Sequence, residues 1–230
     1  MIFDPIYFLF LAPAFLLSLW ASFRTRSAFK KYSNVRIASR LTGAQAAQLM
    51  LDAAGLRDVS VVRTSGFLSD HYNPVTKTLA LSESVYDTPS VAAVGVACHE
   101  AGHALQHAKN YAPLWIRSAL VPTANIGSSL GYIGMMIGLF MNLSGLVLLG
   151  AVLFSAVLLF QIITLPVEFD ASARAKKQAV ALGIVTPHER QGVDRVLNAA
   201  AMTYVAAAVS SLLTLLYFLM RAGLLGGRDE

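Results

Sequence analysis

The sequence predicts a mainly α-helical membrane protein with four transmembrane helices and a cytoplasmic α+β part. Of its 230 residues, 56% are hydrophobic and only 13% are charged, whereas a soluble domain carries about 25% charged residues. The 50 residues from Ser118 to Val167 contain no charge. Most of the 18 Lys and Arg lie on either side of them, between Arg24 and Arg117 or between Arg174 and Arg195. This pattern excludes a disordered chain and argues against nucleic acid as a partner.

Four segments are long and apolar enough to cross the hydrocarbon core, which takes about 20 helical residues. The predicted spans are Ile2–Phe23, Leu120–Met141, Leu143–Leu165 and Val196–Met220. The first is interrupted only by Asp4, and basic residues follow it instead of preceding it, so we expect an uncleaved anchor and not a signal peptide. The chain then divides into an anchor (1–23), a first extramembrane segment (24–117), a transmembrane hairpin (118–165), a second extramembrane segment (166–195), a last span (196–220) and a tail (221–230).

The positions of the basic residues predict which side of the membrane each segment faces, because Lys and Arg close to a span mark its cytoplasmic end. Such residues follow the first span (Arg24, Arg26, Lys30 and Lys31) and the third span (Arg174, Lys176 and Lys177). Only Arg221 and Arg228 oppose this orientation. We therefore expect a multi-pass protein of the inner (plasma) membrane, embedded in membrane lipids, with both extramembrane segments in the cytoplasm and both termini outside.

Glycines recur at three- and four-residue spacing in the second predicted span, at positions 127, 131, 134 and 138. Small residues at this spacing let two helix backbones approach closely. We favour another span of the same chain as the partner helix. A second copy of the chain or another membrane protein is the alternative, so the sequence leaves a homo-oligomer open.

The first cytoplasmic segment is predicted to be α+β. Thr42 is placed to cap a short helix over Gly43–Ala54. Val59–Arg63 has the β-branched composition of a strand. The runs Phe67–Tyr72 and Lys77–Ser82 flank turn residues and predict a β-hairpin.

A longer helix follows in the same segment. Thr88 is placed to cap it, with Pro89 in the first helical position, and we expect it to run over Ser90–Lys109. The second cytoplasmic segment is predicted to be helical over Pro166–Leu182 and then to turn near Pro187.

The Ser90–Lys109 helix contains the sequence His99-Glu100-Ala101-Gly102-His103. Histidines four residues apart lie on one helix face, so both imidazoles can reach one metal ion. A zinc ion held in this way keeps a position open for water and lowers the pKa of that water to about 7. Glu100 can take the proton of the water and later pass it to the leaving amine. We favour a catalytic zinc site over three polar residues on a solvated helix face.

At these residues the chain resembles a known family. The sequence His-Glu-Ala-Gly-His-Ala-Leu-Gln that begins at His99 is similar to the motif of the YugP-type membrane zinc metallopeptidases, also called neutral zinc metallopeptidase family 2. The resemblance covers nearly the whole chain and includes Ser69–Pro74, Leu79–Ser82, Leu165–Ser172 and Ala199–Ala206. It implies a multi-pass bacterial membrane hydrolase of peptides. We expect its cytoplasmic part to be zincin-like, with a small sheet and the motif helix.

A third protein ligand is expected, because a catalytic zinc ion usually has three. The candidates after the motif are Glu168, Asp170, His188, Glu189 and Asp194. We assign Glu168, which follows the third span and precedes alanines that allow close packing against the motif helix. Asp170 lies about 200° around a helix from Glu168, so the two cannot face one metal. Asp170 stands four residues before Arg174, the spacing of an intrahelical ion pair, and it remains the alternative ligand.

The resemblance agrees with this assignment in part. Many zinc peptidases with a glutamate as third ligand place an aspartate four residues after it, bonded to a ligand histidine. Here that position is Ser172. We expect Asp170 to replace the missing aspartate only if the backbone is not helical there.

Several other polar residues have weaker cases. His71, in the hairpin, could orient a substrate or a ligand, and Tyr204 could donate a hydrogen bond to the oxyanion formed during peptide attack. An ordinary strand histidine and an interfacial tyrosine are the alternatives. His107 lies about 12 Å along the helix axis from the first motif histidine, too far to share its metal ion. We expect Cys98 to be buried and His188 to face solvent.

Together these features predict an integral membrane zinc endopeptidase that acts on peptide or protein substrates, with Glu100 as base and then acid. The alternative is a membrane scaffold or regulatory protein with a structural zinc ion. A closed structural site usually has four protein ligands. Because Cys98 is the only cysteine, such a site would need a further histidine or carboxylate.

Overall fold

The computed structural model describes residues 5–225, and the chain forms two compact units. The first unit contains the chain up to Ala21, Ile116–Leu165, and the chain from Thr203 onward; the second contains Ser22–Trp115 and Pro166–Met202. Asp4, Arg228 and the rest of the predicted tail beyond residue 225 lie outside the described residues.

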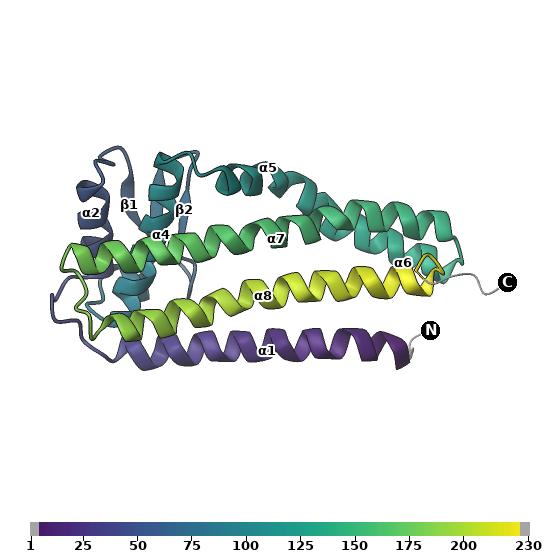
Figure 1. Ribbon diagram of the computed structural model, residues 1–230, viewed down its shortest axis with the longest axis horizontal. Coiled ribbons are helices and arrows are strands. Elements are labelled where there is room, and N and C mark those ends of the chain that lie inside the picture. Colours follow the sequence, from purple (N-terminus) through teal and green to yellow (C-terminus); the bar gives the residue numbers. More distant parts are fainter. Residues whose placement is uncertain (1–4, 226–230) are drawn as a thin grey trace. The chain divides into compact units, whose positions relative to one another are not determined.

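Three helices are long and apolar enough to cross a membrane (Figure 1). They are α1 (Pro5–Ser33), α7 (Ser144–Ala181) and α8 (Arg190–Arg221). The first holds all but the outermost residues of the first predicted span, and the other two contain the third and fourth almost entirely. Each of these helices continues past the apolar stretch into the second unit.

The predicted second span, Leu120–Met141, is helical but divided. It consists of the end of α5 (Ala112–Ile126), a π-helical turn η1 (Gly127–Gly131) and α6 (Tyr132–Phe140). None of the three pieces is by itself long enough to cross the hydrocarbon core. Three of the four spans are therefore supported by the structure, and the second stays a prediction.

In the first unit, the glycines of the second predicted span lie against α7. A Cβ atom on Gly127 would lie 2.3 Å from the carbonyl oxygen of Leu153, and one on Gly131 would lie 2.8 Å from the backbone nitrogen of Phe154. No larger residue fits at such distances, so glycine is what permits the helices to touch. The prediction that these glycines pack against another span of the same chain is confirmed.

The second unit contains a three-stranded sheet with the strand order β1-β3-β2. The strands are β1 (Ser60–Thr64), β2 (His71–Asn73) and β3 (Thr78–Ser82). The predicted hairpin is confirmed, since β2 and β3 are antiparallel, but its first strand has only three residues. The predicted first strand is also present, displaced by one residue, and it pairs in parallel with β3. The central strand is buried, with Leu79 and Leu81 fully covered.

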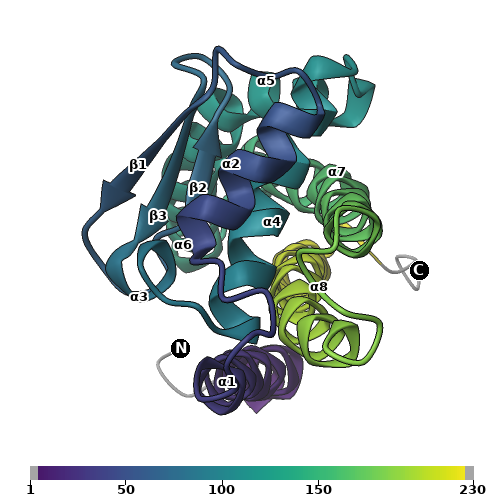
Figure 2. The same cartoon turned by 90° about the vertical axis from the view of Figure 1, so that its left-hand side faces the viewer.

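Helices α2 (Gly43–Ala53) and α4 (Val91–Ala108) lie beside this sheet, and a short helix α3 (Glu83–Tyr86) follows β3 (Figure 2). The predicted cap of α2 is confirmed as a capping box, in which the side chain of Thr42 accepts from the backbone of Gln45 and the side chain of Gln45 accepts from the backbone of Thr42. Most residues of α4 are buried. The second unit is thus an α+β structure centred on the motif helix.

The predicted start of the motif helix is wrong. The N-cap is Ser90 and not Thr88, because the side chain of Ser90 accepts a hydrogen bond from the backbone N–H of Ala93 (3.2 Å). Ser90 is held in an extended conformation by a β-bridge to Arg36, so the helix cannot begin before Val91. Both Thr88 and Ser90 are capping residue types, and the bridge decides between them.

The third predicted span and the helix predicted over Pro166–Leu182 form one continuous helix, since α7 runs through Pro166 and ends at Ala181. Gly183 follows with a φ of 67°, the conformation that ends many helices at a glycine. Since the backbone is helical from Pro166 onward, Glu168 and Ser172 lie one turn apart on the same face of α7.

Candidate metal centre

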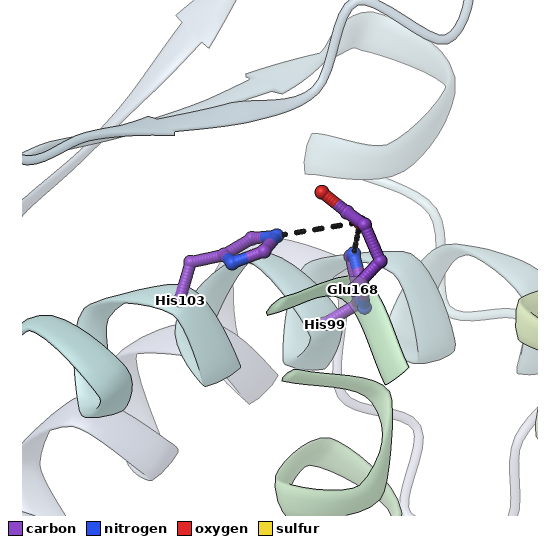
Figure 3. Close-up of side chains that lie close together, drawn as sticks. All are labelled: His99, His103 and Glu168. Atoms are coloured by element: carbon purple, nitrogen blue, oxygen red, sulfur yellow. Dashed lines mark hydrogen bonds and ion pairs between the residues drawn. The ribbon is translucent and has the colours of Figure 1, made fainter. Parts of the chain in front are cut away.

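The two motif histidines and Glu168 lie close together in the second unit (Figure 3). His99 and His103 are one turn apart on α4, and Glu168 comes from α7. Oε2 of Glu168 lies 3.2 Å from Nε2 of His99 and 3.6 Å from Nε2 of His103. Ligands about 2.1 Å from a zinc ion in a tetrahedron are about 3.4 Å apart. The three side chains therefore fit a zinc ion in both residue type and spacing.

Glu168 reaches the histidines because α4 and α7 pack closely at this point. A Cβ atom on Gly102 would lie 2.5 Å from the carbonyl oxygen of Ala171. Ala171 and Ala175, on the same face of α7, are fully buried. The expectation that the alanines of this segment allow close packing against the motif helix is confirmed, and the glycine of the motif contributes the other half of the contact.

The site is buried and contains the carboxyl group of Glu168. Glu168 is 3% exposed and His103 is 7% exposed. Burial by itself lowers the pKa of His103, but the contacts with Glu168 outweigh this effect, so the pKa of the imidazole is raised. A buried carboxylate needs a partner of opposite charge. A divalent cation between these three ligand atoms would provide it.

Glu100, the residue after the first histidine, is also buried, with 8% exposure. Burial raises the pKa of its carboxyl group, because the charged form loses its hydration. A raised pKa favours uptake of a proton by this carboxyl group.

Each motif histidine has its second ring nitrogen hydrogen-bonded. Nδ1 of His99 lies 3.1 Å from Oγ of Ser172, and Nδ1 of His103 lies 3.0 Å from Oε1 of Gln106. In both rings Nε2 is the nitrogen nearer to Glu168. Histidines that bind zinc usually have this arrangement, with the outer nitrogen held by a neighbouring polar group. Ser172 thus contacts the histidine at the position where many zinc peptidases have an aspartate.

Asp170 contacts neither histidine. Its Oδ2 accepts hydrogen bonds from Nε of Arg174 (2.5 Å) and from Nε2 of Gln106 (2.8 Å). The predicted intrahelical ion pair with Arg174 is confirmed. Because α7 is helical there, Asp170 does not take the place of the missing aspartate, which agrees with the expectation, and it reaches His103 only through the side chain of Gln106.

A family comparison agrees with this geometry. The family described as "putative neutral zinc metallopeptidase" matches residues 7–223. The chain belongs to this neutral zinc metallopeptidase family. A protein of Bacillus subtilis (strain 168) named "putative membrane protease YugP" is 47% identical over 224 residues, which cover 97% of this chain and 99% of that protein. No solved structure matches the chain.

For two other candidate residues of this zinc metallopeptidase family member, the predicted roles remain predictions. His71 is exposed at the start of the edge strand β2, and its Nδ1 lies 2.8 Å from the carbonyl oxygen of Ser69. Tyr204 is half-buried on α8, in a part of the helix that belongs to the first unit. The proposed roles of His71 with a substrate and of Tyr204 with an oxyanion are untested.

The other polar residues considered in the sequence are not part of the metal-binding group formed by the two histidines and Glu168. His107 contacts the hydroxyl group of Tyr72 through Nδ1 (2.8 Å), in agreement with the expected polar role away from the metal. His188 is exposed as expected. Cys98 is 1% exposed, and burial raises the pKa of its thiol to about 12. Of the alternative ligands, Glu189 accepts a hydrogen bond from the backbone N–H of Ala38, and Asp194 pairs with Lys176.

Gln106 is a functional candidate that sequence reasoning missed. It lies three residues after His103, on the same helix face, and it is fully buried. A glutamine one helical turn after the second motif histidine was the available signal, since an amide on that face can hydrogen-bond the outer nitrogen of a ligand histidine.

Proposed function

We propose that this protein is an integral membrane zinc endopeptidase. The observation that carries the proposal is the meeting of His99 and His103 with Glu168 from another helix, at separations that suit tetrahedral zinc coordination. The family of the chain and the name of its B. subtilis relative support peptide bonds as the substrate class.

In this proposal the three residues hold the ion, and Glu100 moves the proton. Zinc bound there would lower the pKa of a coordinated water to about 7 and polarise the carbonyl group of the substrate. Glu100 accepts a proton from the attacking water and delivers it to the nitrogen of the leaving amine. Ser172 and Gln106 keep the two imidazoles in position through their Nδ1 atoms.

The geometry favours an enzyme over a scaffold with structural zinc. Structural zinc sites usually have four protein ligands, whereas catalytic sites have three and keep a position for water. Among the described residues, three potential ligands meet at this site. An absorption spectrum of the cobalt-substituted protein that responds to added azide or hydroxamate would support the open position.

Removal of the metal tests the proposal directly. Treatment of the detergent-purified protein with a zinc chelator is expected to abolish cleavage of an unfolded model protein, and stoichiometric zinc is expected to restore it, because the ligands are preorganised by α4 and α7. Cleavage rate and zinc content are measured on the same samples. Unchanged cleavage by protein that metal analysis shows to be zinc-free would contradict the proposal, and magnesium serves as the control ion.

We also propose four spans, with the second formed by the helical residues 120–141, and a metal site that faces the cytoplasm. The basic residues that flank the first and third spans support this orientation. Single cysteines at Ser65 and Asn142, both exposed positions, are introduced in a Cys98→Ser background and probed with a membrane-impermeant thiol reagent on intact cells. We expect labelling of Asn142→Cys in intact cells and of Ser65→Cys only after lysis. The opposite pattern would invert the topology.

A further inference from the structure

Gln106 has a hydrogen-bond partner for each polar atom of its buried side chain. The residue is 0% exposed. Its amide nitrogen donates to the carbonyl oxygen of Val167 (2.8 Å) and to Oδ2 of Asp170 (2.8 Å), while its amide oxygen lies 3.0 Å from Nδ1 of His103. Two acceptors on one side identify the nitrogen, so the orientation of the amide is determined by its surroundings.

This orientation determines which nitrogen of His103 carries the proton. A carbonyl oxygen can only accept a hydrogen bond, so Nδ1 of His103 must be the donor in its contact with Gln106. Neutral imidazole has one N–H group. In the neutral imidazole, which is the form that binds a metal ion, the lone pair is then on Nε2, the nitrogen that lies 3.6 Å from Glu168.

The anchor of the amide is itself held in place. Asp170 accepts from Nε of Arg174 (2.5 Å), and the guanidinium of Arg174 lies over the ring of Tyr111, 5.6 Å from its centroid. The backbone N–H of Tyr111 donates to the backbone carbonyl oxygen of Gln106 (3.0 Å). Rotation of the side-chain amide of Gln106 would break its own three hydrogen bonds, to Val167, Asp170 and His103.

We infer that Gln106 is a positioning residue that imposes the metal-binding tautomer on His103, with Asp170 and Arg174 as its anchor. This inference rests on the metal site proposed above. His99 differs, because the hydroxyl group of Ser172 can either donate or accept and therefore imposes no tautomer. Gln106 thus holds one of the two histidines in the tautomer that metal binding requires.

Zinc affinity and a cobalt spectrum test this inference. Gln106→Met keeps the length of the side chain but removes the acceptor, and we expect zinc binding, measured by competition with a chelator, to weaken about 10- to 100-fold. The d–d absorption of the cobalt-substituted protein is expected to change in the same variant. Gln48→Met is the matched control, since Gln48 is an exposed helical glutamine that bonds to Asp52, and it should bind zinc like the wild type.

A compensating exchange separates positioning from packing. Gln106→Glu places a second carboxylate against Asp170 and is expected to weaken zinc binding. Adding Asp170→Asn restores one amide and one carboxylate in exchanged positions, so that the new carboxylate can accept from His103 and the new amide can donate to that carboxylate. The double variant should bind zinc more tightly than Gln106→Glu alone, with an interaction energy between the two sites, although the carbonyl oxygen of Val167 loses its donor in both variants.

The outcomes are distinct. Wild-type affinity in Gln106→Met, or a double variant that binds no better than Gln106→Glu alone, overturns the inference and leaves the proposed peptidase intact. Wild-type protein that binds no zinc overturns the proposed function as well. If Gln106→Met does not fold, as judged by thermal unfolding of the metal-free protein, the comparison between Gln106→Glu and the double variant decides.

Discussion

The Glu100→Gln protein is expected to cleave an unfolded model substrate about 10²- to 10⁴-fold more slowly than the wild type, the range that general acid–base catalysis contributes. An amide has nearly the same shape as the carboxyl group but cannot take a proton from water. Zinc content should remain unchanged, because Glu100 is not part of the group formed by His99, His103 and Glu168. Initial rates and zinc content of the purified protein measure both effects.

Glu83→Gln is the matched control for this substitution. Glu83 is an exposed glutamate at the start of α3 in the same unit, so the loss of its charge should leave the cleavage rate unchanged. Equal rates for wild type and Glu100→Gln, at full zinc content, would remove Glu100 from the mechanism. Absence of cleavage by either protein, with zinc bound, would favour the scaffold.

The Glu168→Gln protein is expected to lose zinc and, with it, cleavage. With a neutral amide in place of the carboxylate, the two histidines are the remaining protein ligands. The substitution also removes the buried negative charge of Glu168, a residue that is 3% exposed. Removal of a hydrogen-bond partner of a metal ligand lowers metal affinity about 10- to 100-fold. The removal of a ligand itself should lower zinc affinity by more than this. Zinc content after dialysis and the dissociation constant from chelator competition measure it.

Asp170→Asn is the comparison that makes this result specific. Asp170 reaches the site only through the amide of Gln106, so its substitution should retain zinc and reduce affinity less than Glu168→Gln does. Full zinc content and cleavage in Glu168→Gln, together with their loss in Asp170→Asn, would reverse the assignment of the third ligand.

Local patterns predicted much of the secondary structure of the second unit. Each of these elements is specified by residues within a few positions of one another: the cap at Thr42, the hairpin and the motif helix. Such local conformational preferences can be recognised in the sequence without knowledge of the tertiary contacts. The start of α4 was predicted wrongly because it depends on a contact between residues far apart in the sequence. Ser90 caps the helix because a bridge to Arg36, far away in sequence, keeps it extended.

The carboxylate that meets the two motif histidines was predictable to within two residues. The sequence placed an acidic residue after an apolar span and before a run of alanines, which favoured Glu168 and left Asp170 open. The close contact between Gly102 and Ala171 is what brings α7 near enough to α4 for one of them to reach both imidazoles. The helical backbone turns Glu168 toward the histidines and Asp170 toward Arg174.

By itself, the sequence determined the three candidate spans that length and hydropathy define, the pair of histidines on one helix face, and the carboxyl group beside them. These depend on helix geometry and transfer free energy, which act along the chain. Only the tertiary structure decided how the imidazoles are held, since Ser172 contacts a histidine 73 residues away and Asp170 contacts an amide 64 residues away. Hydrogen bonds of this kind depend on atomic positions set by packing between helices, and no periodicity in the sequence encodes them.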